Sequence, residues 1–132
     1  MTIRATGEFD VRMVPQTTGY GTEGSALARM AIDKQFHGDL EATSQGQMLS
    51  AGTAVQGSAG YVALERVRGA LAGRNGTFVL LHRGVMDRGA PHLTITVVPD
   101  SGTDGLTGIA GTMGIEIADG KHSYDFEYQL AQ

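Results

Sequence analysis

The chain of 132 residues contains no cysteine and only three prolines. Without cysteine it forms no disulfide bond, and it offers no thiolate to an iron–sulfur cluster or to a cysteine-bearing zinc site. The absence of cysteine also fits a cytoplasmic location. A chain of this length buries roughly two-thirds of its surface on folding, which is enough for a core without cross-links.

Positive charge is scarce as well, because ten Lys and Arg stand against fourteen Asp and Glu, for a formal net charge of −4. No basic stripe appears, which argues against sequence-independent binding of nucleic acid. No apolar run approaches the ~20 residues of a membrane-spanning helix, and residues 1–7 lack the apolar segment of a signal peptide. We therefore expect neither a nucleic-acid partner nor a membrane partner.

Glycine is abundant, with 20 residues that recur at the ends of segments, and long helical periodicity is absent. This pattern is typical of an all-β protein. The length fits one domain over residues 1–132, and the polar stretch 15–25 is too short for a linker between domains. We predict about eight strands, near residues 3–14, 26–36, 40–50, 60–71, 77–86, 92–99, 107–117 and 121–130.

Consecutive antiparallel hairpins leave exposed sheet edges, and closing the sheet removes them. We therefore predict a closed, antiparallel, eight-stranded barrel, mostly of up-and-down hairpins, with an interior that holds side chains or one small ligand. A two-sheet sandwich is the alternative. The facing of residues 26–36 and 40–50 stays open, since apolar residues lie on both sides of the alternation: Met30, Ile32 and Phe36 on one, and Leu27, Leu40 and Met48 on the other.

The hairpin formed by residues 61–72 and 77–86 carries the main functional signal. Its linker, residues 73–76, reads Gly-Arg-Asn-Gly and predicts a turn. Closing the hairpin there makes Glu65 and His82 diagonal neighbours on an apolar face. The predicted pairs are Leu71 with Phe78, Gly69 with Leu80, Val67 with His82, Glu65 with Gly84 and Ala63 with Met86.

Glu65 and His82 are the candidate catalytic residues. Burial raises the pKa of a carboxyl and a neighbouring imidazolium lowers it, so such a pair can act as general acid and base or anchor a polar ligand atom. The alternative is a structural pair that satisfies itself inside the barrel. Because desolvation offsets most of the attraction in a buried pair, we expect replacement of both residues by leucine to leave the melting temperature equal or higher.

The last hairpin is the most sharply defined, because Asp119-Gly120 is a strong type I′ turn signal. One face of the resulting hairpin is almost wholly apolar and the other is polar, so the register is well specified. The predicted pairs are Ile117 with His122, Ile115 with Tyr124, Met113 with Phe126, Gly111 with Tyr128 and Ile109 with Leu130.

Four further residues are candidates for ligand binding: Tyr61, Tyr124, Tyr128 and His122. The tyrosine hydroxyls could orient a ligand in the same cavity as Glu65 and His82, or the rings could simply belong to the core with their hydroxyls at its rim. His122 lies beside the 119–120 turn, which places it at a barrel mouth.

No metal site and no cofactor site is predicted. His37, Asp39 and Glu41 share a face only if the strand is regular through Gly38, and that glycine marks a turn. Residues 19–24 match the dinucleotide-binding pattern of three glycines, but they do not lie in a strand–helix–strand unit, so the match is discarded.

Several segments together resemble a bacterial family of uncharacterised proteins, the domain of unknown function 3224. They are residues 36–44, 60–65, 76–82 and 97–103, and the resemblance covers nearly the whole chain. It implies a calycin-like closed barrel related to the allene-oxide-cyclase-like superfamily, whose members include plant cyclases and bacterial polyketide cyclases. Such barrels use an apolar cavity to fold a flexible substrate. The family brings no established activity with it.

Three functions follow from these observations. The first is a cofactor-free isomerase or cyclase that binds a small hydrophobic molecule and uses Glu65 and His82 for acid–base chemistry. The second is a non-catalytic binding or carrier protein in which the same residues anchor the ligand. The third is a structural domain that forms a homodimer and whose core is filled by side chains.

Overall fold

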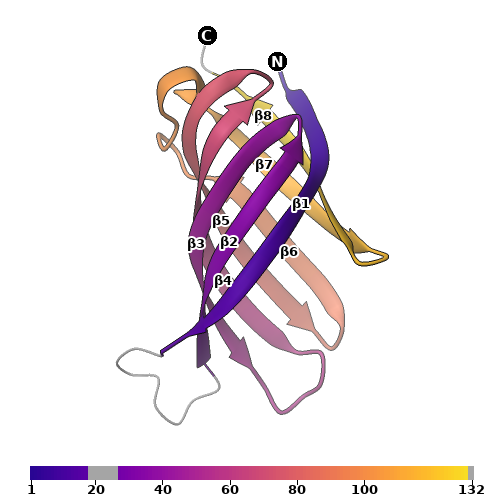
Figure 1. Cartoon of the computed structure of the whole chain (residues 1–132). Coiled ribbons are helices and arrows are strands. Elements are labelled where there is room, and N and C mark those ends of the chain that lie inside the picture. The colour runs from indigo at the N-terminus through magenta and orange to yellow at the C-terminus, as the bar shows by residue number, and fades with distance from the viewer. Residues whose placement is uncertain (18–26, 131–132) are drawn as a thin grey trace.

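The computed structural model describes residues 1–17 and 27–130, so most of the polar stretch 15–25 and the glycine pattern at 19–24 lie outside the described residues. Eight antiparallel strands in chain order form a closed barrel in which β1 pairs with β8 (Figure 1). This confirms the predicted barrel and excludes the sandwich. The strands are β1 (Ile3–Gln16), β2 (Leu27–Gly38), β3 (Leu40–Gly52), β4 (Ala59–Leu71), β5 (Arg74–Asp87), β6 (Ala90–Val97), β7 (Ala110–Ala118) and β8 (Lys121–Gln129).

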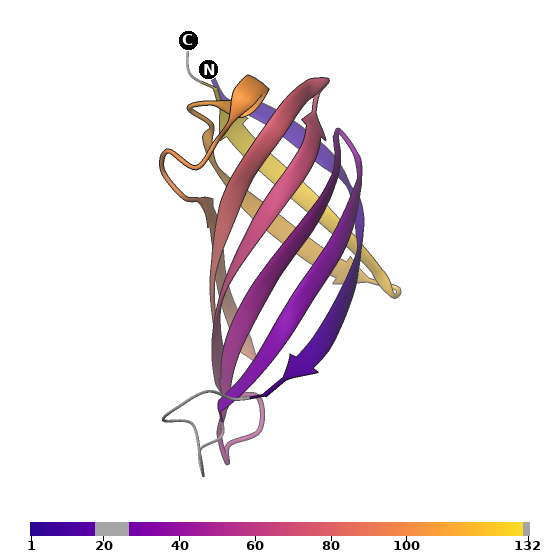
Figure 2. The same cartoon turned by 60° about the vertical axis from the view of Figure 1, so that its left-hand side comes forward.

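The two ends of the barrel differ. At one end, which we name the closed end, β1 begins, β8 ends and the 98–109 segment carries a short 3-10 helix, η1 (Asp104–Leu106), as Figure 2 shows. Leu106 and Ile109 from this segment are almost fully buried and pack into the core. The opposite end, which we name the mouth, carries the 53–58 loop and the β5–β6 turn. None of the helical residues in the described ranges forms a segment long and apolar enough to cross a membrane.

Alternation along the strands sends every second side chain inward. On β2 the inward set is Met30, Ile32, Lys34 and Phe36, and on β3 it is Leu40, Ala42, Ser44 and Met48. This settles the facing that the sequence left open, because the apolar residues of both strands fall on the same side once the two strands are paired through Phe36 and Ala42. Leu27 is the one that faces outward, with 41% of its surface exposed.

The β7–β8 hairpin has the predicted register from Ile117–His122 to Gly111–Tyr128. Asp119 and Gly120 both have positive φ, at 53° and 77°, as a type I′ turn requires. A Cβ on Gly111 would lie only 2.8 Å from the Cα of Tyr128, so the absence of a side chain permits this close approach.

The predicted register of the β4–β5 hairpin is wrong by four residues. The turn consists of Ala72 and Gly73, both with positive φ (48° and 84°), and Glu65 pairs with Leu80 while Ala63 pairs with His82. Gly76 continues β5 instead of forming the turn, and a Cβ there would lie 2.2 Å from the carbonyl oxygen of Thr103. The absence of a side chain at Gly76 therefore allows the 98–109 segment to pack closely against β5. A shift of four residues is even, so no side chain changes face.

One junction of the barrel is weak. The ladder between β6 and β7 consists of a single described pair, Thr96 with Thr112, whereas each of the other ladders has seven or more described pairs. Pro91 on β6 has no N–H to donate, which is typical of a strand edge. The barrel thus has a seam between β6 and β7 on the mouth side of Thr96.

Candidate functional site

A cluster of polar side chains lies inside the barrel around Glu65, and we name Lys34, Ser44, Glu65 and His82 the polar cluster. Each has an exposed fraction of 7% or less. The Glu65 Oε1 atom accepts hydrogen bonds from Lys34 Nζ at 2.9 Å and from His82 Nε2 at 2.7 Å, and Oε2 accepts one from Ser44 Oγ at 2.6 Å. Four strands, β2 to β5, each contribute one of these residues.

Glycines on the neighbouring strands make room for this arrangement. Gly46 on β3 pairs with Glu65, and a Cβ there would lie 2.7 Å from the Cβ of Glu65. Gly84 on β5 pairs with Tyr61, and a Cβ there would lie 2.2 Å from the Tyr61 ring. Each glycine thus allows a larger side chain opposite it to occupy the barrel interior.

The Glu65 carboxyl is ionised at neutral pH. Burial by itself raises its pKa, but the hydrogen bond from His82, the positive charge of Lys34 and the hydrogen bond from Ser44 act in the opposite direction. Together they lower the pKa of Glu65 from 4.5 to about 2. The Lys34–Glu65 ion pair therefore places one positive and one negative charge in the interior.

Lys34 has a second set of partners. Its Nζ lies 4.9 Å from the ring centroid of Phe9 and 5.7 Å from that of Phe36, within the range of cation–π attraction. Throughout the described ranges, no buried side-chain nitrogen or oxygen lacks a hydrogen-bond partner. The cluster is therefore held in a defined geometry by its own contacts.

The contact with Glu65 determines which nitrogen of His82 carries the proton. An ionised carboxylate only accepts hydrogen bonds, so the Nε2 atom that faces it carries a proton, and Nδ1 is the atom left to face another partner. Tyr61 lies on the Nδ1 side, with its hydroxyl oxygen 3.4 Å away. Burial and the nearby Glu65 charge raise the pKa of the Tyr61 phenol, which keeps it protonated. Carboxylate, imidazole and phenol thus form a continuous chain.

Tyr61 also lines a cavity that opens at the mouth of the barrel, and we name it the mouth cavity. Its volume is about 600 Å³, and its surface is almost wholly apolar. Strands β3 to β7 contribute to it, with Met48, Tyr61, Met86, Leu93, Ile115 and Ile117 among the lining residues. The phenol of Tyr61 therefore connects the polar cluster with the apolar cavity.

Of the residues singled out from the sequence, Glu65, His82 and Tyr61 lie in one network. Glu65 and His82 are still diagonal neighbours despite the wrong register, because the correction moves His82 from opposite Val67 to opposite Ala63, two residues to the other side of Glu65. Tyr124, Tyr128 and His122 also face the interior, but none of them lines the mouth cavity. The His122 ring instead contacts Phe9, at 5.3 Å between centroids.

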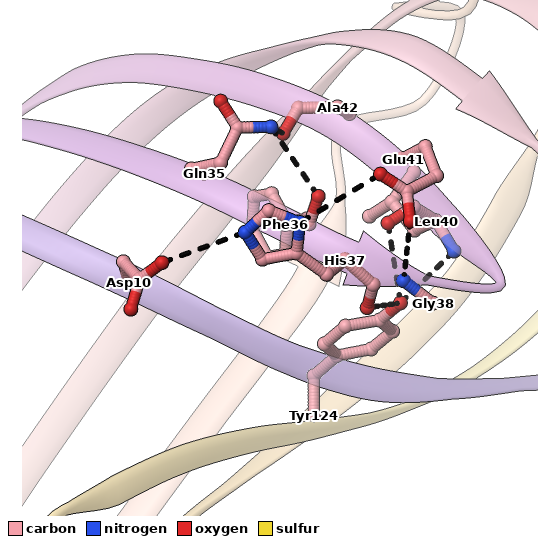
Figure 3. A network of polar contacts seen from close by, with 9 residues as sticks. All are labelled: Asp10, Gln35, Phe36, His37, Gly38, Leu40, Glu41, Ala42 and Tyr124. Carbon is pink, nitrogen blue, oxygen red and sulfur yellow. Dashed lines mark hydrogen bonds and ion pairs between the residues drawn. The ribbon is translucent and has the colours of Figure 1, made fainter.

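Tyr124 has a structural partner at the closed end. Its hydroxyl donates to the carbonyl of His37 at 2.9 Å and accepts from the N–H of Leu40 at 2.9 Å, so it ties β8 to the β2–β3 turn (Figure 3). The same view shows His37 between Asp10 and Glu41, at 3.5 Å and 3.7 Å. These three side chains are exposed, and within residues 1–17 and 27–130 no group of three His, Cys, Asp or Glu could hold a metal ion.

Sequence reasoning missed Lys34 and Ser44, which complete the cluster. Neither residue was identified, because the sequence left undecided which side of residues 26–36 and 40–50 points into the barrel. The available signal was the position of Lys34 between Ile32 and Phe36, where it is the one charged residue on an otherwise apolar side of its strand. A charge in that position, on a strand inside a barrel, requires a buried partner of opposite sign.

Comparison with known proteins places the chain among proteins without a described activity. Residues 5–128 match the family described as a protein of unknown function (DUF3224). A solved structure of a DUF3224 protein of unknown function from Shewanella oneidensis MR-1 is 50% identical, covers 100% of both chains and superimposes with a TM-score of 0.93. No curated protein matches the chain.

Proposed function

The chain belongs to the DUF3224 family, and from the geometry of its own residues we propose that the mouth of its barrel binds a small apolar or amphipathic molecule. The observation that carries this proposal is that Tyr61 lines the mouth cavity and that its hydroxyl contacts His82 of the polar cluster. An apolar cavity with a few converging polar groups is the usual form of a small-molecule site. The polar cluster is costly to bury, and a ligand-directed role accounts for its retention.

The first form of the proposal is a cofactor-free isomerase or cyclase, in keeping with the resemblance to allene-oxide-cyclase-like barrels. The apolar wall restricts the conformation of a flexible substrate. When His82 is doubly protonated, its Nδ1 donates to the Tyr61 oxygen and the phenol hydrogen turns towards the ligand. Proton transfer from Tyr61 to a ligand carbonyl is matched by transfer from Nδ1 to Tyr61, and the reverse steps return the proton after rearrangement.

The second form is a carrier without catalysis. It is favoured by the composition of the cavity, whose wall offers little polar surface, with Tyr61, Ser50 and His92 as its polar side chains. In this form the Tyr61 hydroxyl anchors one oxygen or nitrogen atom of the ligand, and the polar cluster fixes the orientation of that hydroxyl through His82. The two forms are distinguished by incubating the bound molecule with the protein: an enzyme converts it into a product, whereas a carrier releases it unchanged.

The experiment is native mass spectrometry of freshly purified protein, followed by titration with the molecule found or, if none co-purifies, with the neutral fluorescent probe N-phenyl-1-naphthylamine. We expect Tyr61→Phe to weaken binding of an oxygen-bearing ligand by about tenfold, the equivalent of one hydrogen bond. Tyr128→Phe is the matched control, since it removes a hydroxyl that does not line the cavity. Absence of any bound molecule and of any probe binding contradicts the proposal.

A further inference from the structure

The seam between β6 and β7 separates two hollows. On the mouth side of the Thr96–Thr112 pair, a continued register would place Leu93 opposite Ile115 and Thr94 opposite Gly114, but neither pair forms. Leu93 and Ile115 line the mouth cavity on the inner side. On the outer side lies a groove of about 370 Å³, which we name the seam groove.

The two hollows share Leu93. This residue lies on an inward-facing position of β6, yet 41% of its surface is exposed, and it lines both the mouth cavity and the seam groove. On β7, Ile115 lines the mouth cavity and its neighbour Gly114 lines the seam groove. No ladder pair forms between the described residues of β6 and β7 at this point, so the two hollows are neighbours across the wall of the barrel with Leu93 between them.

The hollows differ in polarity. The surface of the mouth cavity is almost wholly apolar, whereas that of the seam groove is more polar than apolar: Thr94, Thr112, Asp125 and Glu127 line it beside the apolar Leu93, Ile95 and Met113. Arg4 already binds both oxygens of Asp125, at 2.8 Å and 2.6 Å, so that carboxylate is neutralised. With Glu127 the groove has an excess of negative charge, which disfavours an anionic group and suits one that donates hydrogen bonds.

We propose that the ligand of the mouth cavity is an amphiphile whose apolar body fills the cavity and whose uncharged, hydroxylated head group passes between β6 and β7 into the seam groove. This inference rests on the proposed function and adds the ligand class. A molecule that occupies both hollows places each of its halves against a surface of matching polarity, and it needs no opening of a paired ladder.

The test fills the groove without touching the cavity. A Cβ on Gly114 would meet one atom within 4 Å, the carbonyl oxygen of Asp125 at 3.9 Å, so Gly114→Phe places a ring in the groove without backbone overlap. The probes are N-phenyl-1-naphthylamine, which is small and neutral, and two competitors of equal chain length, monodecanoylglycerol and decanoate, both below their micellar concentrations. Displacement of probe fluorescence measures the affinity of each competitor. Thr43→Phe, at an exposed position on the outer face of β3 and remote from both hollows, is the control.

We expect the wild-type protein to bind monodecanoylglycerol about tenfold more tightly than decanoate, and Gly114→Phe to lose that preference while its affinity for the naphthylamine probe is unchanged. The same preference in Gly114→Phe and in the wild type, or equal binding of the two competitors by the wild type, overturns the assignment of the head group to the seam. Failure of the naphthylamine probe to bind a wild-type protein that carries no co-purified molecule overturns the proposed function, and this inference with it.

Discussion

At the residue scale, Glu65 is the side chain on which the polar cluster depends. It accepts hydrogen bonds from Lys34, Ser44 and His82, and it is the partner that neutralises Lys34. From the sequence, replacing both Glu65 and His82 by leucine was expected to leave the melting temperature equal or higher. That expectation treated the two residues as an isolated pair. The presence of Lys34 changes that expectation, because the loss of Glu65 leaves an ammonium group buried without its counter-charge.

We predict that the double variant Glu65→Leu with His82→Leu is destabilised by about 3–5 kcal/mol, the cost of breaking a buried ion pair on one side. Adding Lys34→Met should recover most of that loss, since the third change removes the orphaned charge and keeps a side chain of similar length. Urea unfolding of the wild-type, double and triple variants measures the difference. Equal stability of the double and triple variants would show that Lys34 finds water or another partner.

The pH dependence of stability follows from the same carboxyl. Its pKa is lower in the folded protein, at about 2, than its ordinary value of 4.5. The contribution of the Glu65 carboxylate to the free energy of unfolding is therefore fully present above about pH 4.5 and is lost as the pH falls towards 2. Its size is on the order of 3 kcal/mol.

We predict that the free energy of unfolding of the wild type falls steeply between about pH 4.5 and pH 2, and that Glu65→Gln is less stable near neutrality but falls less steeply over that interval. Urea unfolding at several pH values measures both slopes. Asp10→Asn serves as the control, because it removes an exposed carboxylate outside the cluster. Parallel curves for the wild type and Glu65→Gln would mean that Glu65 does not carry this dependence.

At the element scale, the two hairpins show what sequence could and could not predict. Asp119-Gly120 is the only turn signal between β7 and β8, so strand positions, register and facing were all predictable there. Between β4 and β5 the strongest turn residues, Asn75 and Gly76, lie inside a strand, because Gly76 is required by packing against Thr103 from a segment distant in sequence. Such tertiary demands are invisible to local turn rules.

The candidate site was predictable to a similar extent. Alternation placed Glu65 and His82 on one face and survived the register error, since parity depends on the position along the strand and not on the partner. The contributions of Lys34 and Ser44 were not predictable, because their facing depends on how β2 and β3 pair through the turn at Gly38. Alternation therefore predicted the half of the cluster on β4 and β5 but not the half on β2 and β3.

The β4–β5 turn gives a prediction at this scale. Ala72 has a φ of 48°, which an alanine adopts at a cost and which Asn tolerates better. We predict that Ala72→Asn stabilises the protein by about 0.5–1 kcal/mol, measured as the shift of the urea midpoint at constant slope. Ala118→Asn, at the exposed end of β7, is the matched control and should be neutral or slightly destabilising. A loss of stability in Ala72→Asn would contradict this account of the turn.

At the scale of the whole molecule, the buried core and the proposed binding cavity lie at opposite ends of the barrel. The closed end holds the large buried side chains, including Phe36, Leu40, Leu71, Phe78 and Phe126, and it is covered by Leu106. The mouth end has inward-facing side chains that stay partly exposed around a cavity of about 600 Å³. A mouth that is not filled by its own side chains contributes less to the core and leaves room for another molecule.

Two inward-facing residues of the same strand test this division. Phe78 lies near the closed end of β5 with 1% of its surface exposed, and Met86 lies at the mouth with 43% exposed. We predict that Phe78→Ala costs about 3–5 kcal/mol of stability, as for a fully buried aromatic ring, and that Met86→Ala costs less than about 1 kcal/mol. Binding of N-phenyl-1-naphthylamine should respond in the opposite order, with Met86→Ala weakening it several-fold and the milder Phe78→Leu leaving it unchanged. A ring lost from the closed end removes contacts on every side, whereas a methionine lost from the mouth removes wall area that only a ligand covers. Equal costs for the two alanine variants, or unchanged probe binding in Met86→Ala, would show that the mouth is part of the core.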